Sequence, residues 1–261
     1  MANLRVFLLG GLLSYRALFS WMSPWIFIPS LIITPVFQIL LFAYIGHAAG
    51  VGDDRFFLIG NAIQYASIPC LFAMGNTISG ERRSSTLSLL LVTPARRIAI
   101  FGGRAVPTIA NSAAVTIISM AIGAALLRVT IPFSALLPLL VVIVIAAASC
   151  TGLGLLLAAV ALRVRETAVL PNIVYGVMLI FGGVNVALSS LPTWMQAVGD
   201  ALPLTHAIEA ARLVAAGRPF STATTLLAVE IGIGATYAVL GFLLLRLLET
   251  ASRRHATLEL M

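Results

Sequence analysis

Residues 134–161 read SALLPLLVVIVIAAASCTGLGLLLAAVA and contain no charged side chain. A helix needs about 20 consecutive apolar residues to cross the hydrocarbon core of a bilayer, so this stretch is long enough to span one. Further charge-free windows occupy 17–52, 56–80, 105–127 and 167–199. Together the windows indicate a chain that crosses a membrane several times.

The composition of the whole chain agrees with this interpretation. Of its 261 residues, 60% are hydrophobic and 10% are charged, and the mean hydropathy is +1.06. Soluble domains carry about 25% charged residues, and a soluble fold of this size could not hide so much apolar surface. We therefore predict an all-α integral membrane protein, with one domain over 1–261 and six transmembrane helices. The predicted spans are 25–46, 56–79, 105–127, 134–161, 168–190 and 225–247.

The N-terminal segment 1–22 is predicted to be an interfacial helix. Arg5 and Arg16 are eleven positions apart, so they nearly eclipse each other on a helix. An uncleaved helix that lies along the membrane surface would keep both guanidinium groups among the lipid head groups.

A second non-spanning segment, 191–219, precedes the last span. Its middle, from Ala201 to Ala216, is helical in character but too short and too charged to cross a bilayer. We predict a re-entrant helix hairpin on the outer side. Within it, Glu209 and Arg212 are spaced to pair on one helix face.

The basic residues predict the orientation of the chain. All 16 are arginines, and if both termini are cytoplasmic, twelve fall on the inner side and four on the outer side. Cytoplasmic loops of membrane proteins carry such an excess of positive charge. We therefore expect both termini in the cytoplasm.

The most charged stretch, GERRSSTLSLLLVTPARR at 80–97, then lies in the cytoplasm. Leu87, Leu90 and Leu91 fall on one face of a short helix, and Pro94 stops this helix because it disfavours helical backbone at the preceding residue. The pattern alone leaves two interpretations open for the region 80–103. It is either a positively charged loop that fixes topology or a helix whose apolar face packs on a cytoplasmic partner.

Several chemistries are excluded by the residues present. A P-loop needs a lysine to reach the terminal phosphates of a nucleotide, and the chain has no lysine. His206 and Glu209 give two ligands where a catalytic zinc needs three. A nucleic-acid surface would need more basic residues on a soluble fold. We expect no catalytic, cofactor-binding or metal site on this chain, no enzymatic activity and no nucleic-acid partner.

Polar residues inside the predicted spans are candidate functional groups. Glu230 is the one charged residue within the apolar stretch 222–245 of the last span. Such a carboxylate can mark ion-coupled transport, reach the outer head groups, or pair with Arg212 or Arg218. Uncharged polar residues could line a substrate path, or equally well hydrogen-bond between helices. These residues are Gln38, Asn61, Gln64, Asn172 and Asn185.

Two motifs resemble those of a known family. Residues 81–94, ERRSSTLSLLLVTP, resemble the E-x-x-x-G-T-L-x-x-L-L-x-T-P signature after the second span of type-2 ABC exporter permeases, such as the daunorubicin exporters. The run 203–206, PLTH, with Glu209 and Arg212, is similar to a segment before the last span of the same family. The chain departs at Ser85, where the family commonly has glycine, and at Ser88, where it often has an acidic residue.

The resemblance implies a permease of the bacterial inner membrane that pairs with two separate ATP-binding cassette subunits and a second permease, either an identical copy or a related chain. ATP and magnesium would bind the partner subunits, and this chain would hold no cofactor. Its cargo would be an amphipathic drug, natural product, lipid or glycolipid, with a role in drug resistance among the implied functions. The ATPase contacts would map to Glu81, Arg82, Arg83, Thr86, Leu87, Leu90, Thr93, Arg163, Arg165 and Glu166.

Two alternatives from other classes remain open. One is a secondary transporter driven by an ion that binds Glu230. The other is a membrane-embedded assembly protein without transport activity.

Overall fold

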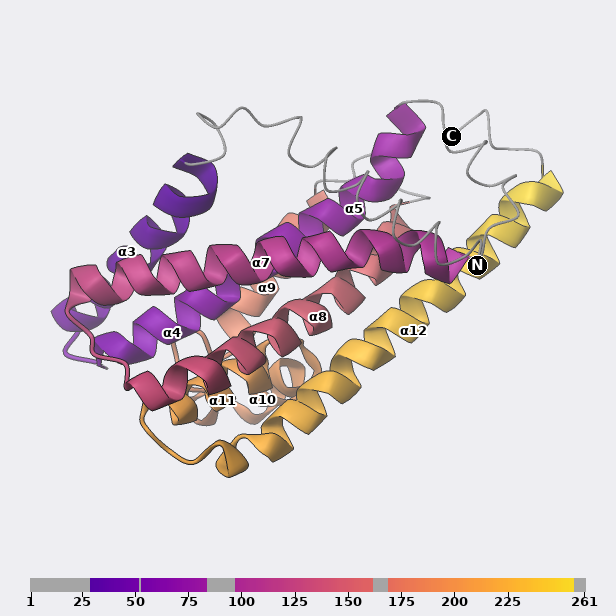
Figure 1. Ribbon diagram of the computed structural model, residues 1–261. Coiled ribbons are helices and arrows are strands. Elements are labelled where there is room, and N and C mark those ends of the chain that lie inside the picture. The colour runs from indigo at the N-terminus through magenta and orange to yellow at the C-terminus, as the bar shows by residue number, and fades with distance from the viewer. Residues whose placement is uncertain (1–28, 52, 84–96, 162–168, 256–261) are drawn as a thin grey trace.

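The computed structural model describes residues 29–51, 53–83, 97–161 and 169–255, and the regular elements within these ranges are all helices (Figure 1). In chain order they are a π-helical turn at Pro29–Ile33, α3 (Thr34–Ala48), α4 (Asp54–Tyr65), α5 (Ser67–Arg83), α7 (Arg97–Leu127), a 3-10 turn at Phe133–Ala135, α8 (Leu136–Val160), α9 (Val169–Phe181), a 3-10 turn at Leu188–Ser190, α10 (Thr193–Ala201), α11 (Thr205–Ala215), a 3-10 turn at Phe220–Thr222, and α12 (Thr224–His255).

The all-α prediction is confirmed for the described part of the chain. Two shorter apolar helices, α3 and α9, lie where the first and fifth spans were predicted. The six-span topology therefore stays a prediction, and the predicted interfacial helix at 1–22 lies outside the described residues. Four helical segments in the described part are long and apolar enough to cross a membrane: Asp54–Gly75, Gly102–Leu127, Phe133–Val160 and Thr224–Leu248.

The fifth apolar segment ends earlier than its hydropathy predicts. The prediction places its end near residue 190, whereas α9 ends at Phe181. The glycine pair that follows explains the difference, because Gly183 has a φ of +69°, a left-handed conformation that glycine adopts without steric cost. The chain then turns through residues 182–187 instead of continuing as a helix.

The helix predicted for the second span is broken at Ala66, between α4 and α5. Pro69 has no N–H to donate to the carbonyl four residues earlier, so it weakens the helix at this point. Ser112 of α7 donates a hydrogen bond of 2.5 Å to the carbonyl of Ala66, and Ser67 donates one of 2.6 Å to the carbonyl of Gln64. Side-chain hydroxyls thus satisfy carbonyls at the break.

The bundle is built around α8, the helix of the longest apolar run. Helices α5, α7, α11 and α12 all pack against it. At one end of the bundle lie α10, α11 and the turn between α3 and α4; we call this the hairpin end (Figure 1). The end of α5 at Arg83, the start of α7 at Arg97 and the C-terminal part of α12 lie at the opposite end (Figure 1).

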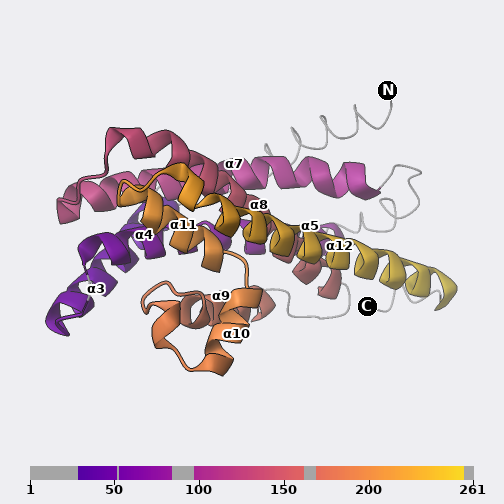
Figure 2. The same ribbon diagram turned by 90° about the horizontal axis from the view of Figure 1, so that it is seen from below.

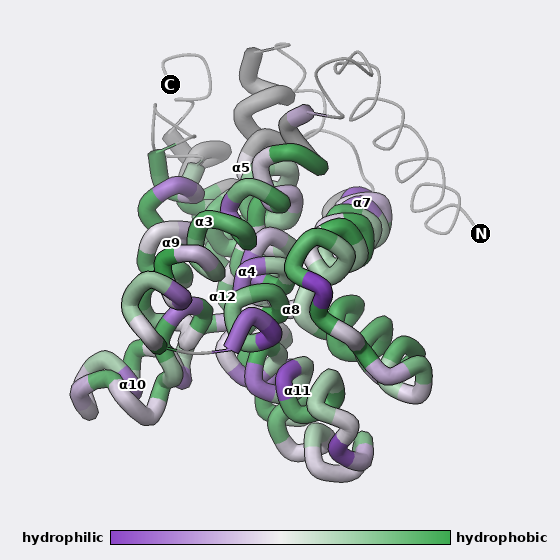
Figure 3. The backbone as a smooth tube through the Cα atoms, turned by 90° about the vertical axis from the view of Figure 1, so that its left-hand side faces the viewer, coloured by the Kyte–Doolittle hydropathy of each residue, from purple (hydrophilic) through white to green (hydrophobic). Residues whose placement is uncertain are grey.

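The other views show how the shorter helices sit beside this bundle. Seen from below, α9 and α10 lie together to one side of α4, α8 and α12 (Figure 2). Seen from the hairpin end, hydrophobic residues colour most of α7, α8 and α12, and hydrophilic residues gather near the start of α4 and around α11 (Figure 3). The hairpin end of the described chain therefore carries polar groups beside its apolar helices.

Helices α8 and α12 approach each other closely because glycines line their contact. A Cβ atom added at Gly234 would stand 2.6 Å from the Cα of Ser149, and one at Gly241 would stand 2.6 Å from the backbone nitrogen of Leu156. Such distances leave no room for a side chain. The same helix carries Gly232, where an added Cβ would meet nothing within 4 Å.

We predict that Gly234→Ala lowers the free energy of unfolding by about 1–3 kcal/mol, because the new methyl group separates α12 from α8. The matched variant Gly232→Ala should leave stability unchanged or raise it slightly, since alanine favours a helix. Thermal unfolding of both variants in detergent, followed by size-exclusion chromatography, measures the difference. Equal midpoints for the two variants would contradict the close approach of α8 and α12.

Candidate functional site

A buried carboxylate joins the last long helix to the short helix α11. Glu230 lies in the second turn of α12 and is 0% exposed. Its Oε1 accepts a hydrogen bond of 2.8 Å from the backbone N–H of Leu204, and its Oε2 accepts one of 3.3 Å from the N–H of Ala207. Both donors belong to the beginning of α11, so each carboxylate oxygen is bonded to the same helix N-terminus.

Glu230 provides hydrogen-bond acceptors for the N-terminus of α11, which no capping side chain of α11 itself provides. The first N–H groups of a helix lack partners inside the helix, and they give its N-terminus a partial positive charge. Leu204 occupies the N-cap position with a φ of +78° and offers no capping side chain. Glu230 supplies the acceptors and the negative charge from a different helix.

The environment of Glu230 differs from the structural interpretations drawn from its sequence position. The side chain is buried and does not reach the head groups. Neither Arg212 nor Arg218 forms an ion pair with it in the described part of the chain. Since the two backbone N–H groups already neutralise much of the cost of burying the carboxylate, no arginine is needed.

Near the other end of α11, Arg212 is hydrogen-bonded to two neighbouring segments. Its Nη1 donates to the carbonyl of Gly183 at 2.8 Å, and its Nη2 donates to the carbonyls of Val184 at 2.7 Å and Phe56 at 3.2 Å. The guanidinium carbon also lies 3.4 Å from the centre of the Phe56 ring, a cation–π contact. Arg212 thereby connects α11 to the loop after α9 and to the start of α4.

The predicted pairing of Arg212 with Glu209 is wrong for the described structure, in which no ion pair joins the two side chains. Glu209 is exposed, and the backbone carbonyls around Arg212 are closer acceptors than a carboxylate that water solvates. Burial lowers the pKa of Arg212 to about 9, and the charge of Glu209 opposes this change. The guanidinium therefore remains protonated at neutral pH.

Three of the five predicted polar residues form one hydrogen-bonded network. Asn61 donates to Asn185 at 2.8 Å, and Gln38 donates to Asn61 at 3.1 Å. Tyr175 of α9, which the sequence did not single out, donates its hydroxyl to Gln38 at 2.8 Å. This network, Asn185–Asn61–Gln38–Tyr175, ties α3, α4, α9 and the loop after α9 together. It is the interhelical hydrogen bonding that was one of the two interpretations of these positions.

The two remaining polar residues differ from each other. Gln64 is 0% exposed and donates a weak bond of 3.4 Å to the backbone carbonyl of Tyr175. Its Oε1 is buried without a hydrogen-bond partner. Asn172 lies exposed near the start of α9. Gln64 therefore extends the network toward the bundle interior, and Asn172 faces outward.

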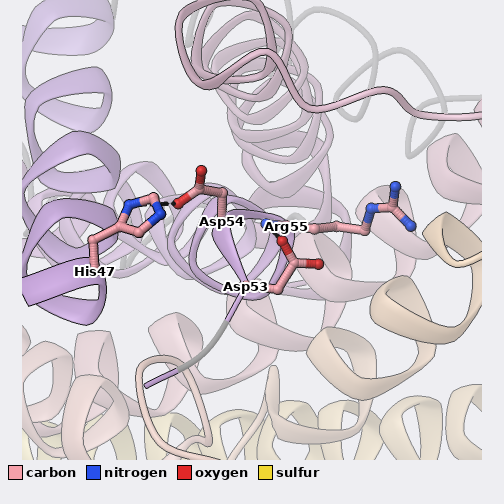
Figure 4. Close-up of polar contacts among 4 residues, drawn as sticks. All are labelled: His47, Asp53, Asp54 and Arg55. Atoms are coloured by element: carbon pink, nitrogen blue, oxygen red, sulfur yellow. Dashed lines mark hydrogen bonds and ion pairs between the residues drawn. The ribbon is translucent and has the colours of Figure 1, made fainter. Parts of the chain in front are cut away.

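Histidine and acidic side chains at the hairpin end form two pairs. His206, with 14% of its side chain exposed, places Nε2 4.0 Å from Oδ1 of Asp200. His47 places Nδ1 3.3 Å from Oδ1 of Asp54, while Asp53 accepts a bond from the backbone N–H of Arg55 (Figure 4). Asp53 is thus the N-cap of α4. No group of three metal-ligating side chains exists among the described residues.

The end of α5, which holds the predicted ATPase contacts Glu81, Arg82 and Arg83, lies at the end of the bundle opposite these pairs (Figure 1). Arg83 and Arg97 are the last and first residues of α5 and α7. The segments that hold most of the predicted contacts, 84–96 and 162–168, lie outside the described residues. The contacts predicted for Glu81, Arg82, Arg83, Thr86, Leu87, Leu90, Thr93, Arg163, Arg165 and Glu166 stay predictions.

A comparison with protein-family models matches this chain to a known family. The family described as ABC-2 type transporter matches residues 11–215, which is more than half of the chain. The matched range includes most of the described helices, and it ends with α11. No curated protein matches the chain.

We predict that Arg212→Lys destabilises the protein by about 2 kcal/mol, because a lysine ammonium cannot donate to three carbonyls in the geometry of the guanidinium. Arg218→Lys is the matched control, since Arg218 is exposed in the loop after α11. Thermal unfolding of both variants in detergent measures the effect. If Arg218→Lys destabilised the protein as much as Arg212→Lys, the stabilising role of the three Arg212 hydrogen bonds would be contradicted.

Proposed function

We propose that this chain exports an amphipathic substrate and that separate ATP-binding subunits power the export. The proposal starts from the family: the chain belongs to the ABC-2 type transporter family and is thus a transmembrane permease of an ABC transporter. The family match over residues 11–215 is the observation that carries this proposal. The substrate class is a drug, natural product, lipid or glycolipid that enters from the cytoplasm or the inner leaflet.

The absence of lysine from the sequence supports a motor on another chain. Without a lysine the chain has no P-loop of the usual form to bind the terminal phosphates of ATP. Two ATP-binding cassette subunits would supply hydrolysis, and two permeases would form the pathway. If ATP is hydrolysed on those subunits, this chain is a transporter subunit and not an enzyme.

The placement of the long helices supports coupling through the region 80–103. Helices α5 and α7 flank this region and end together at the pole of the bundle opposite α10 and α11 (Figure 1). Both pack against α8. An ATP-driven displacement of a docking helix at 84–93 would therefore pass into α5 and α7 and from them to the centre of the bundle.

The polar network is where substrate would contact the proposed pathway. Asn61 lies between Gln38 and Asn185 and joins groups from α3, α4 and the loop after α9. These groups are bonded to one another in the described state, so contact with substrate would require them to exchange partners. A state change that moves α3 or α9 would make them available.

Ion-coupled transport through Glu230 is less favoured by the same structure. Each oxygen of this carboxylate is already bonded to the backbone of α11. A carboxylate that binds a transported ion would have to give up these bonds in every cycle. Capping of α11 explains the presence of Glu230 without a coupling ion.

We predict that Leu87→Asp combined with Leu90→Asp abolishes co-purification of the permease with its ATP-binding subunit, because it places charge on the apolar face of the predicted docking helix. Membrane insertion, measured by yield in the membrane fraction, should be unchanged. Ser88→Asp is the matched control, since it adds the same charge where the family often has an acidic residue.

Retention of the ATP-binding subunit by the double leucine variant would contradict the docking proposal. Loss of the subunit in Ser88→Asp as well would show a general effect of charge in this segment and would also contradict it.

A further inference from the structure

We infer that Glu230, with His206 and Asp200, forms a proton-responsive latch that holds the N-terminus of α11 against α12. In its ionised form Glu230 keeps α11 seated, and when it takes up a proton from the hairpin end it releases the beginning of α11. This inference concerns the permease alone, and it depends neither on the cargo nor on the ATP-binding subunits.

The first step of the argument is the geometry of the carboxylate. Both oxygens of Glu230 accept N–H bonds, from Leu204 and Ala207. An ionised carboxylate accepts through both oxygens, whereas a protonated one carries a hydroxyl group that points a donor at one of these N–H groups. Protonation therefore removes one bond and also the attraction between the negative charge and the helix N-terminus.

The second step is the absence of a fixed counter-ion. In the described part of the chain, the titratable groups that face Glu230 are His206 on α11 and the thiol of Cys150 on α8. Ser149 of α8 donates to the backbone carbonyl of Glu230 at 3.3 Å. Arg212, at the far end of α11, is occupied by three carbonyls. The charge of Glu230 is thus compensated by the backbone N–H groups of α11 and not by a fixed ionic partner.

The third step is a route by which a proton can reach the buried carboxylate. Asp200 has 59% of its side chain exposed, and it lies 4.0 Å from His206, which has 14% exposed. His206 is adjacent in sequence to Ala207, whose N–H contacts Glu230. The Nδ1 of His206 and the hydroxyl of Thr205 are buried without hydrogen-bond partners in the described residues. An imidazole with one nitrogen near the surface and one free inside can pass a proton inward.

The consequence of release follows from how α11 is held. Its N-terminal end is bonded to α12 through Glu230, and its C-terminal end is bonded to the loop after α9 and to Phe56 through Arg212. Loss of the first attachment leaves the second in place. The beginning of α11 and the preceding turn would then move about Arg212, so acid at the hairpin end would loosen this part of the permease.

Hydrogen exchange of the full-length wild-type chain in lipid nanodiscs tests the inference directly. Exchange is followed by mass spectrometry between about pH 7.5 and about pH 4.5, a range that covers the usual pKa values of histidine and glutamate, with times scaled to the intrinsic amide rate at each pH. Amides 204–208 should lose about tenfold of their protection at the acidic end, as expected for the loss of one helix cap. Amides 212–216 in the same helix should keep theirs.

Three variants separate the latch from a general effect of acid. Glu230→Gln should exchange quickly at 204–208 at every pH and show no transition. Glu209→Gln is the matched control, because it makes the same change at an exposed position of α11 and should keep the wild-type profile. His206→Gln removes the ionisable side chain next to the latch and should alter the acid transition at 204–208, whereas an unaltered wild-type profile in this variant would overturn the role of His206.

Protection at 204–208 that stays constant in the wild-type chain across this range would overturn the latch, even if the Glu230 variant failed to fold. A wild-type pH profile in Glu230→Gln would overturn it as well. Because no ATP-binding subunit is present in the experiment, either result would leave the proposed export function untouched, and a failure of ATP-driven export would leave the latch untouched.

Discussion

The contact between the Glu230 carboxylate and the N-terminus of α11 organises the hairpin end of this protein. A buried charge in an apolar bundle is costly unless hydrogen bonds compensate for it, and here each oxygen is bonded to a backbone N–H group. Helix α11 has 11 residues, and isolated helices shorter than about 12–15 residues are marginal. Packing and polar contacts at both ends therefore keep α11 in place.

These contacts join segments that lie far apart in the sequence. Glu230 ties α11 to α12, and Arg212 ties it to the loop after α9 and to the start of α4. The neighbouring network from Asn185 to Tyr175 ties the same loop to α3. Displacement of any of these helices would therefore displace the others at the hairpin end.

The sequence predicted the parts of this fold that depend on hydropathy. The apolar run at 134–161 forms the central helix α8, and the region 191–219 contains the short helices α10 and α11. Three of the five polar positions chosen from the predicted spans lie in one hydrogen-bonded network. Polar side chains inside apolar helices need partners, so their clustering follows from the same physics.

The parts that the sequence did not predict depend on backbone groups. The partners of Glu230 and Arg212 are N–H and carbonyl groups, which every residue carries and no motif marks. The spacing of Glu209 and Arg212 suggested an ion pair on one helix face, but Arg212 instead donates hydrogen bonds to backbone carbonyls of other segments. The early end of α9 had a local signal in Gly182 and Gly183, whereas hydropathy alone extended the helix through them.

The most direct test of the account is transport by the permease in inverted membrane vesicles, with and without its ATP-binding subunit. Uptake of fluorescent amphipathic compounds should require both chains and ATP, and it should persist when the ion gradients are collapsed. Uptake by this chain alone, driven by an ion gradient and abolished by Glu230→Gln, would contradict the account.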